Sequence, residues 1–358
     1  MNNNIMENQT LKNESSVIGQ QTSQSKLQSI FFVRAVCSLG IIIFHYFCHS
    51  NGNFKILFKT ANATWGFMLT TCFFCISGNV LYYNYPKLYS LKKFYYKRWR
   101  SIFPSFYICF IYFFLNNVFA YHKIFYNGHW SKLLITIIGL DGYLNYRLKT
   151  YFIIGEWFLG AIIIIYALYP LILWLMNKNI FIIYFIVFIF YFIMYKTNYF
   201  IIIQDINIIS CINSFYFGMI SIKFKNIFFE TKIILFISFF ISIFLNIIKV
   251  SDFILVFQIQ GYSLFIILMT LGKFIMTKIK TKFFYQISKI SYSIYLIHHR
   301  VIFAILGLNN PIEWYLHLIL ILCIIIFTII CSIIHFMVVN SVINSEIFKK
   351  LDSFFLHS

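Results

Sequence analysis

Charged residues are scarce in this chain, and acidic residues are the scarcest. Of 358 residues only 11% are charged, with 10 Asp and Glu against 29 Lys and Arg. Soluble domains usually carry about 25% charged residues. Hydrophobic residues instead make up 61% of the chain and aromatic residues 22%. The composition therefore excludes an ordinary soluble globular protein and favours an all-α, polytopic integral membrane protein.

Three further features are missing. Residues 1–27 are polar and have neither the basic start nor the apolar core of a signal peptide, so we expect a disordered cytoplasmic tail. Cys72 and Cys75 form a CxxC inside a hydrophobic run without a second pair, which argues against a zinc or redox motif. Basic residues lie in short loops rather than on one soluble face, so we expect no nucleic-acid partner. We also expect no metal and no permanently bound cofactor.

Ten apolar segments approach or reach the length of about 20 residues that a membrane helix needs. They lie near 29–48, 63–83, 101–120, 152–175, 179–195, 206–222, 231–248, 253–272, 284–305 and 313–340. The run 133–140 is too short and is expected in a structured external loop. With the N-terminus inside, the inner loops hold about twice as many Lys and Arg as the outer loops. We therefore predict cytoplasmic termini, a transmembrane domain over 28–345 and a short cytoplasmic tail over 346–358.

The first predicted span contains two ionisable residues, each of which costs about 2.5–3.5 kcal/mol to insert. Arg34 and His45 are about three helical turns apart, so they share one helix face and differ in depth by about 16 Å. One interpretation is an arginine that reaches the cytoplasmic surface and a histidine at the outer interface. The other is a pair that faces a polar interior.

Polar residues also mark two later spans. Glu156 lies at the outer mouth of the fourth, where it is either an interfacial residue or the partner of a buried His or Arg. The ninth contains Tyr292, Tyr295, His298, His299 and Arg300. Arg300 lies in its outer half, far from the cytoplasmic surface, which indicates a polar cavity rather than contact with lipid.

A basic run is expected in the loop between the second and third spans. It includes Lys97, Arg98 and Arg100. These residues either signal topology and attract anionic lipid, or form an anion site for a phosphorylated cofactor, since Arg binds phosphate through its bidentate fork.

Five short blocks, in this order along the chain, resemble the acyltransferase-3 family of membrane O-acyltransferases, which act on bacterial surface polysaccharides and related acceptors. The blocks are Arg34 with His45 (Arg-x10-His), Phe73–Gly78 (Phe-Phe-x-x-Ser-Gly), Arg98–Pro104 (an arginine-rich run ending in Ile-x-Pro), Trp157–Gly160 followed by Tyr169 and Pro170, and Ile290–His298 (Ile-Ser-Tyr-Ser-x-Tyr-Leu-x-His). The resemblance covers residues 29 to about 345. Ser101 stands where the family often has a basic residue, and His299 where it often has Pro.

The resemblance implies transfer of an acyl group, usually acetyl, from acetyl-CoA or another cytoplasmic acyl-CoA to a hydroxyl of a carbohydrate acceptor. It also implies a multi-pass protein of the bacterial cytoplasmic membrane. His45 would act as the general base, because the unperturbed pKa of His lies near working pH, or as a transiently acylated nucleophile. Glu156 would then hold the imidazole tautomer, and Arg34 would bind the thioester arm or a phosphate.

The remaining candidates would contact the two substrates. Lys97, Arg98 and Arg100 would dock the phosphates of CoA electrostatically. Tyr292, Tyr295, His298 and Arg300 could supply donors to the substrate or to a tetrahedral oxyanion.

Other functions remain open at this point. A transporter or flippase of lipid-linked saccharides explains the helices and the intramembrane charges equally well, but it predicts no dependence on acyl-CoA. A membrane polysaccharide polymerase usually has a larger outer loop than 121–150, and a scaffold would not need polar residues aligned within its spans.

Overall fold

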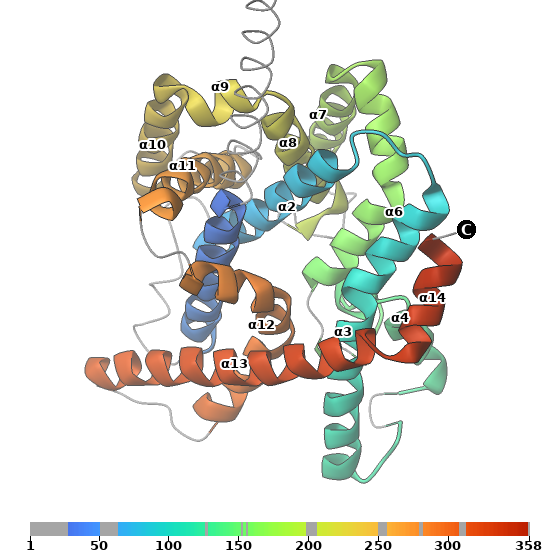
Figure 1. Ribbon diagram of the computed structural model, residues 1–358. Helices are drawn as coiled ribbons and strands as arrows, with labels where there is room; N and C mark the ends of the chain where they lie inside the picture. Colours follow the sequence, from blue (N-terminus) through green and yellow to red (C-terminus); the bar gives the residue numbers. More distant parts are fainter. Residues whose placement is uncertain are drawn as a thin grey trace, which may run out of the picture.

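The computed structural model describes residues 28–50, 64–125, 128–151, 153–154, 157–197, 206–249, 256–278, 282–307 and 313–356. These residues form an all-helical fold (Figure 1). Among them, six helices are long and apolar enough to cross a membrane: Gln28–His49, α2 (Trp65–Asn84), α3 (Leu91–Tyr121), α6 (Trp157–Lys178), α11 (Val256–Lys278) and α13 (Trp314–Ile343).

Four further helices overlap the remaining predicted segments. They are α7 (Phe181–Lys196), α8 (Ile208–Lys223), α10 (Lys232–Ile247) and α12 (Lys282–Leu306). The first three contain shorter apolar stretches, so their crossing of the membrane, and with it the total of ten spans, stays a prediction. Short helices complete the described chain: η2 (Trp130–Lys132), α4 (Leu133–Ile137), α5 (Asp141–Leu144), α9 (Lys225–Glu230) and α14 (Glu346–Leu356).

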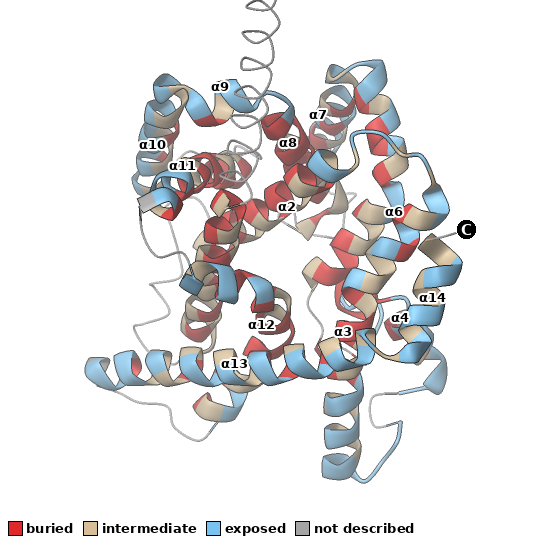
Figure 2. Cartoon of the chain, viewed as in Figure 1, coloured by how far each residue is buried: buried red, intermediate tan, exposed pale blue. Residues whose placement is uncertain are grey.

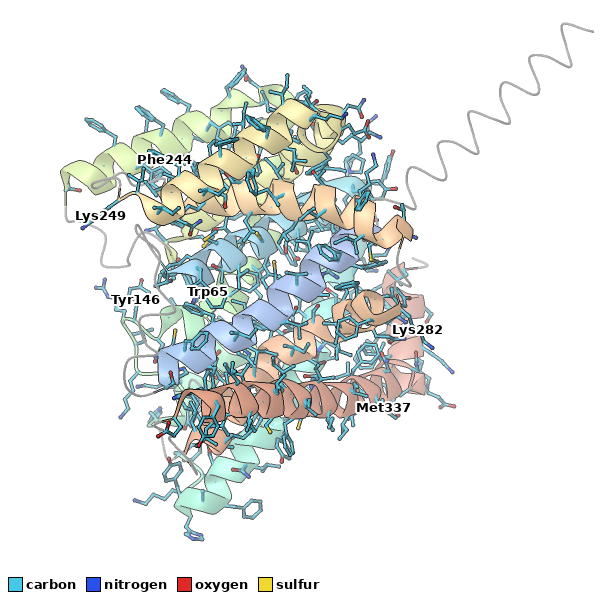
Figure 3. All side chains as sticks on the ribbon, turned by 90° about the vertical axis from the view of Figure 1, so that its left-hand side faces the viewer. Trp65, Tyr146, Phe244, Lys249, Lys282 and Met337 are labelled. Carbon is cyan, nitrogen blue, oxygen red and sulfur yellow. The ribbon has the colours of Figure 1, made fainter. Side chains whose placement is uncertain are left out.

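The helices place the predicted outer and inner loops at opposite ends of the bundle. Trp65, Tyr146 and Lys249, which precede or follow predicted outer loops or lie within one, sit toward one end in Figure 3. Lys282, in a predicted inner loop, sits toward the other end. This arrangement agrees with the alternation of the predicted spans, whereas the end that faces the cytoplasm stays a prediction.

Apolar side chains cover the outside of the bundle. α10 and α13 are exposed along much of their length, while buried residues gather on α2, α8 and α12 (Figure 2). Phe244 of α10 is 50% exposed and Met337 of α13 is 64% exposed (Figure 3). Such a surface would be costly in water, and it suits contact with lipid chains.

Helices α2 and α8 approach each other closely at two glycines. A Cβ atom at Gly78 would lie 1.9 Å from the carbonyl oxygen of Phe215, and one at Gly218 would lie 2.0 Å from that of Cys75. Only glycine allows this approach, as in other membrane helix pairs held by small residues. Gly78 ends the Phe-Phe-x-x-Ser-Gly block, so its packing role fixes the position of the neighbouring Ser77.

A buried polar network joins α7, α8 and α11. The side-chain oxygen of Gln258 accepts hydrogen bonds from the Tyr191 hydroxyl (2.8 Å) and the Asn213 amide (2.7 Å). Its amide group donates to the Ser210 carbonyl at 2.6 Å. Gln258 is fully buried, and its partners are at most 6% exposed. We refer to Gln258, Tyr191, Asn213 and Ser210 as the glutamine network.

The basic run was predicted to lie in a loop, and this prediction is wrong. The run forms the first turns of α3. The Ser90 side chain caps this helix by accepting a hydrogen bond from the Lys93 amide at 3.3 Å. The helix therefore begins ten residues before the predicted span at 101–120. Two residues that are neighbours in a loop can lie on opposite faces of a helix, and this separates the basic residues, as described below.

The segment expected as a short C-terminal tail contains α14, which packs against the start of α3 (Figure 1). Asp352 accepts hydrogen bonds from the Tyr96 hydroxyl at 2.7 Å and from Nη2 of Arg100 at 3.0 Å. The rings of Tyr96 and Phe355 stack with their centroids 4.5 Å apart. These contacts hold α14 on the end of the bundle that carries the basic run.

Candidate functional site

One cavity of about 350 Å³ gathers most of the residues that the sequence singles out. It lies between the helix Gln28–His49, α2, α3, α6 and α12. The predicted residues that line it are Arg34, His45, Arg98, Tyr292, Tyr295 and His298. Since Arg34 and His45 both line it, the first helix turns its two ionisable residues inward rather than toward lipid.

The cavity has two chemically different ends, because Arg34 and His45 differ in depth by about 16 Å along one helix. α6 runs past both ends. Near its start, the Phe158 ring lies 5.7 Å from the Tyr295 ring, and two turns later Tyr166 lies 5.8 Å from the guanidinium carbon of Arg98. We call the part lined by Arg34, Arg98 and Tyr166 the arginine end, and the part lined by His45, Tyr295 and His298 the histidine end.

Imidazole rings crowd the histidine end. The centroid of the His45 ring lies 5.1 Å from that of His298 and 4.0 Å from that of His299. His49, one turn after His45, follows at 6.1 Å. These imidazoles give the histidine end several groups that can accept or donate a proton.

Hydrogen bonds fix the orientation of the α12 side chains. The Tyr295 hydroxyl accepts a hydrogen bond from the Leu159 amide at 3.1 Å, which ties α12 to the first turn of α6. Nδ1 of His298 lies 2.8 Å from the Tyr295 carbonyl and 3.1 Å from the Ile294 carbonyl. A carbonyl accepts only, so Nδ1 carries the proton and Nε2 of the neutral ring is left as the acceptor.

Tyr292 offers an additional polar group to a ligand. It lines the cavity, and its hydroxyl is buried with no hydrogen-bond partner among the described residues. A buried hydroxyl without a partner costs free energy unless something binds it. The Tyr292 hydroxyl is therefore placed to donate to a molecule that enters the cavity.

Two guanidinium groups mark the arginine end. Neither Arg34 nor Arg98 forms an ion pair with a described carboxylate. The guanidinium carbon of Arg98 instead lies 5.4 Å from the centroid of the Tyr85 ring and 5.8 Å from that of the Tyr166 ring. Two cations without a described counterion, beside a cavity, suit an anionic or strongly polar ligand.

A second cavity of about 690 Å³ lies next to Arg98, at the start of α3. Its lining includes Lys87, Lys93 and Lys97, and also Tyr85, which contacts Arg98. Nζ of Lys97 lies 5.9 Å from the centroid of the same Tyr85 ring. Lys97 thus belongs to a basic cavity that adjoins the arginine end rather than to the first cavity itself.

The structure places the other sequence candidates elsewhere. Arg100 pairs with Asp352 of α14, with Nε and Oδ1 2.8 Å apart, and does not line the first cavity. Arg300 donates from Nε to the Ile153 carbonyl at 2.8 Å, and its guanidinium lies over the Phe113 ring. Glu156, predicted to orient the imidazole, lies outside the described residues.

Several residues of the site were missed by the sequence reasoning. Thr70 and Ser77 of α2 and Tyr166 of α6 line the first cavity, although both helices are mostly apolar. The spacing of Thr70 and Ser77, two turns apart on α2, is the signal that could have identified one polar face. For Tyr166 no such spacing with a second polar residue marked its helix face in the sequence.

Comparison with known families gives one match. A family model described as an acyltransferase domain, Acyl_transf_3, matches residues 27–337. This match includes every residue of the first cavity. Neither a curated protein nor a solved structure matches the chain.

Proposed function

Because this chain belongs to the acyltransferase-3 family, and is therefore a membrane acyltransferase for groups other than aminoacyl groups, we propose that it is an O-acetyltransferase of surface carbohydrate. In this proposal, the donor is acetyl-CoA from the cytoplasm. The acceptor is a hydroxyl of a cell-surface carbohydrate or of its lipid-linked precursor. The enzyme lies in the bacterial cytoplasmic membrane, with ten spans and both termini inside.

The observation that carries the proposal is the shared cavity of Arg34, Arg98, His45 and His298. Acyl transfer from a thioester to a hydroxyl needs a base for the hydroxyl and donors for the oxyanion. It also needs a site for a polyanionic donor. A cavity with guanidinium groups at one end and imidazoles at the other provides these groups in one place.

His45 acts as the general base in this scheme. It takes the proton of the acceptor hydroxyl while the hydroxyl oxygen attacks the thioester carbonyl carbon. The new C–O bond forms, the C–S bond breaks, and His45 returns the proton to the departing CoA thiolate. The Tyr292 hydroxyl, which is buried and has no described partner, donates a hydrogen bond to the transient oxyanion.

CoA enters from the end of the bundle that carries the basic run. Its phosphates and adenosine bind in the second cavity, among the Lys87, Lys93 and Lys97 side chains. The pantetheine arm passes Arg98, which lines the first cavity and touches Tyr85 of the second. The thioester then reaches the histidine end, where the acceptor enters from the opposite side.

The test compares ester-linked acetate on surface glycans of cells that carry the wild-type gene, no gene, or His45→Ala. We expect acetate with the wild type only, and a loss of about 1000-fold in transfer by purified His45→Ala with labelled acetyl-CoA. His129→Ala, which changes an exposed histidine of the outer loop, is the matched control. Equal acetate with and without the gene would refute the proposed reaction, and full activity of His45→Ala would remove His45 as the base.

A further inference from the structure

The histidine end contains three histidines that are close enough together to bind a metal ion. The acyl-transfer scheme uses one of them as a base but does not need the three together. Ligand nitrogens of His45, His298 and His299 all lie within 4.8 Å of one another. The centroids of the His298 and His299 rings are 4.5 Å apart, and both rings lie within 5.1 Å of His45 by the same measure. The three imidazoles come from two helices that are far apart in the sequence.

Three neutral imidazoles form a ligand set that divalent transition metals prefer. Zinc–nitrogen distances are about 2.0–2.1 Å, so tetrahedral ligands lie about 3.4 Å from one another. Histidine nitrogens that lie as far apart as 4.8 Å need to approach by about 1.4 Å to meet this geometry, a movement that side-chain rotation supplies. Metal ions that prefer thiolate ligands, such as Cu(I), are not favoured, because the three residues include no cysteine.

The hydrogen bonds that hold the His298 ring support the same ligand set. Its ring is fully buried, and Nδ1 is held by the Tyr295 and Ile294 carbonyls. Metal-binding histidines usually donate one ring N–H to a carbonyl or carboxylate, which orients the other nitrogen toward the ion. His298 has this arrangement before any ion binds.

The neighbouring cation does not compete for the site. Arg300 follows His299 directly, but Nε of Arg300 donates to the Ile153 carbonyl and its guanidinium lies over the Phe113 ring. His45 and His298 both line the first cavity, so an ion between the imidazoles would have one coordination position open to that cavity.

We propose that His45, His298 and His299 bind one divalent transition-metal ion of the zinc type, with the fourth position open to the cavity. The proposal departs from the expectation of no metal, which was drawn from the cysteine pattern of the sequence. A bound ion occupies the nitrogen lone pair that His45 needs as a base, so filling the site inhibits acyl transfer. This last consequence, unlike binding, rests on the proposed function.

The test uses the full chain, purified in detergent with an affinity tag that contains no histidine, and stripped with a chelator. Zn²⁺ binding is followed by calorimetry, and Co²⁺ binding by the visible absorption of a tetrahedral ion. We expect one ion per chain, and a loss of affinity of at least about 100-fold in both His45→Asn and His299→Asn. The control variant His129→Asn should bind like the wild type.

A measurement on the unmodified protein keeps the proposal testable if the variants fail to fold. Zn²⁺ should protect His45 and His299, but not His129, from modification by diethyl pyrocarbonate, as read by mass spectrometry. The site would be overturned if folded wild-type protein bound no stoichiometric Zn²⁺, or if both variants bound Zn²⁺ as tightly as the wild type. Protection of His129 equal to that of His45 and His299 would also overturn it. Binding with no acyl transfer under any condition would refute the proposed function and leave the metal site standing.

Discussion

Among the regions of this bundle that bury polar groups, the glutamine network and the first cavity do so in different ways. In the glutamine network, Gln258 uses both its oxygen and its amide group on neighbouring helices, through bonds of 2.6–2.8 Å. In the first cavity, by contrast, Arg34 and Arg98 have no described counterion, and the buried Tyr292 hydroxyl has no described partner.

The difference separates a structural role from a functional one. Buried polar groups that are satisfied by protein hold helices in place, because breaking one bond leaves the partner unsatisfied. Polar groups that line a cavity and lack protein partners are instead ready for a ligand. Polarity within a membrane helix therefore does not by itself indicate a site. Asn213 Oδ1 of the network is also buried without a described partner, so the distinguishing feature is a polar group that lines a cavity.

The largest effect is expected from breaking the network. Gln258→Leu leaves the Asn213 amide without its described acceptor and the Tyr191 hydroxyl with Ser210 Oγ as its remaining one, at 3.0 Å. It should destabilise the folded protein by about 2–4 kcal/mol. The melting temperature in detergent should fall, while acyl transfer per folded molecule stays near that of the wild type. Asn84→Ala, which removes only an exposed bond to the Val80 carbonyl, is the control. An unchanged melting temperature of Gln258→Leu would show that the network is not structural.

Variants of Arg98 and Arg100 test which of these two α3 residues belongs to the first cavity. Arg98 lines the cavity, whereas Arg100 pairs with Asp352. Arg98→Gln should raise the apparent KM for acetyl-CoA about tenfold, a cost of about 1.4 kcal/mol, and Arg100→Gln should change it less than about twofold. Asp352→Asn should behave like Arg100→Gln. Equal increases of KM in the two arginine variants would contradict the separation.

The last prediction concerns Asp141, a buried group that belongs to neither region and lies in the segment between α3 and α6. It is 2% exposed, and burial raises the pKa of its carboxyl group from 3.8 to about 6. Between these pH values the unfolded chain has released a proton that the folded protein retains. The folded state therefore loses stability as the pH rises from about 4 to 6, and the loss remains at higher pH.

Asp141→Asn removes this penalty. The variant should be more stable than the wild type at pH 7.5 by on the order of 1–3 kcal/mol. At pH 4 the gain should largely disappear. Melting temperatures at the two pH values measure the difference, and a gain that is equal at both would show that ionisation of Asp141 is not its cause.

The sequence predicted the helices well, because apolar length is a local property. Every predicted span overlaps a described helix. It also placed Arg34 and His45 on one face, since a helix repeats every 3.6 residues. The basic run was harder. Treated as a loop, it grouped Arg98 with Arg100, whereas on α3 these residues are about 200° apart around the axis and meet different partners.

Contacts between distant segments could not be read from the sequence. His299 reaches His45 only because α12 packs beside the first helix, and Gln258 is a single polar residue in α11 whose partners lie on α7 and α8. Pairings of this kind depend on which helices are neighbours and how each is rotated. The segment 346–358, expected as a tail, likewise gave no sign that Asp352 would pair with Arg100.

The most direct test of a single path from the arginine end to the histidine end is the rate of acyl transfer after the cavity is filled. Ser77 lines the cavity from α2, so Ser77→Phe should block it, whereas Ser77→Ala removes only the hydroxyl. In vesicles supplied with labelled acetyl-CoA, Ser77→Phe should transfer about 100-fold more slowly than Ser77→Ala, at equal melting temperature. Equal rates of the two folded variants would contradict transfer through this cavity.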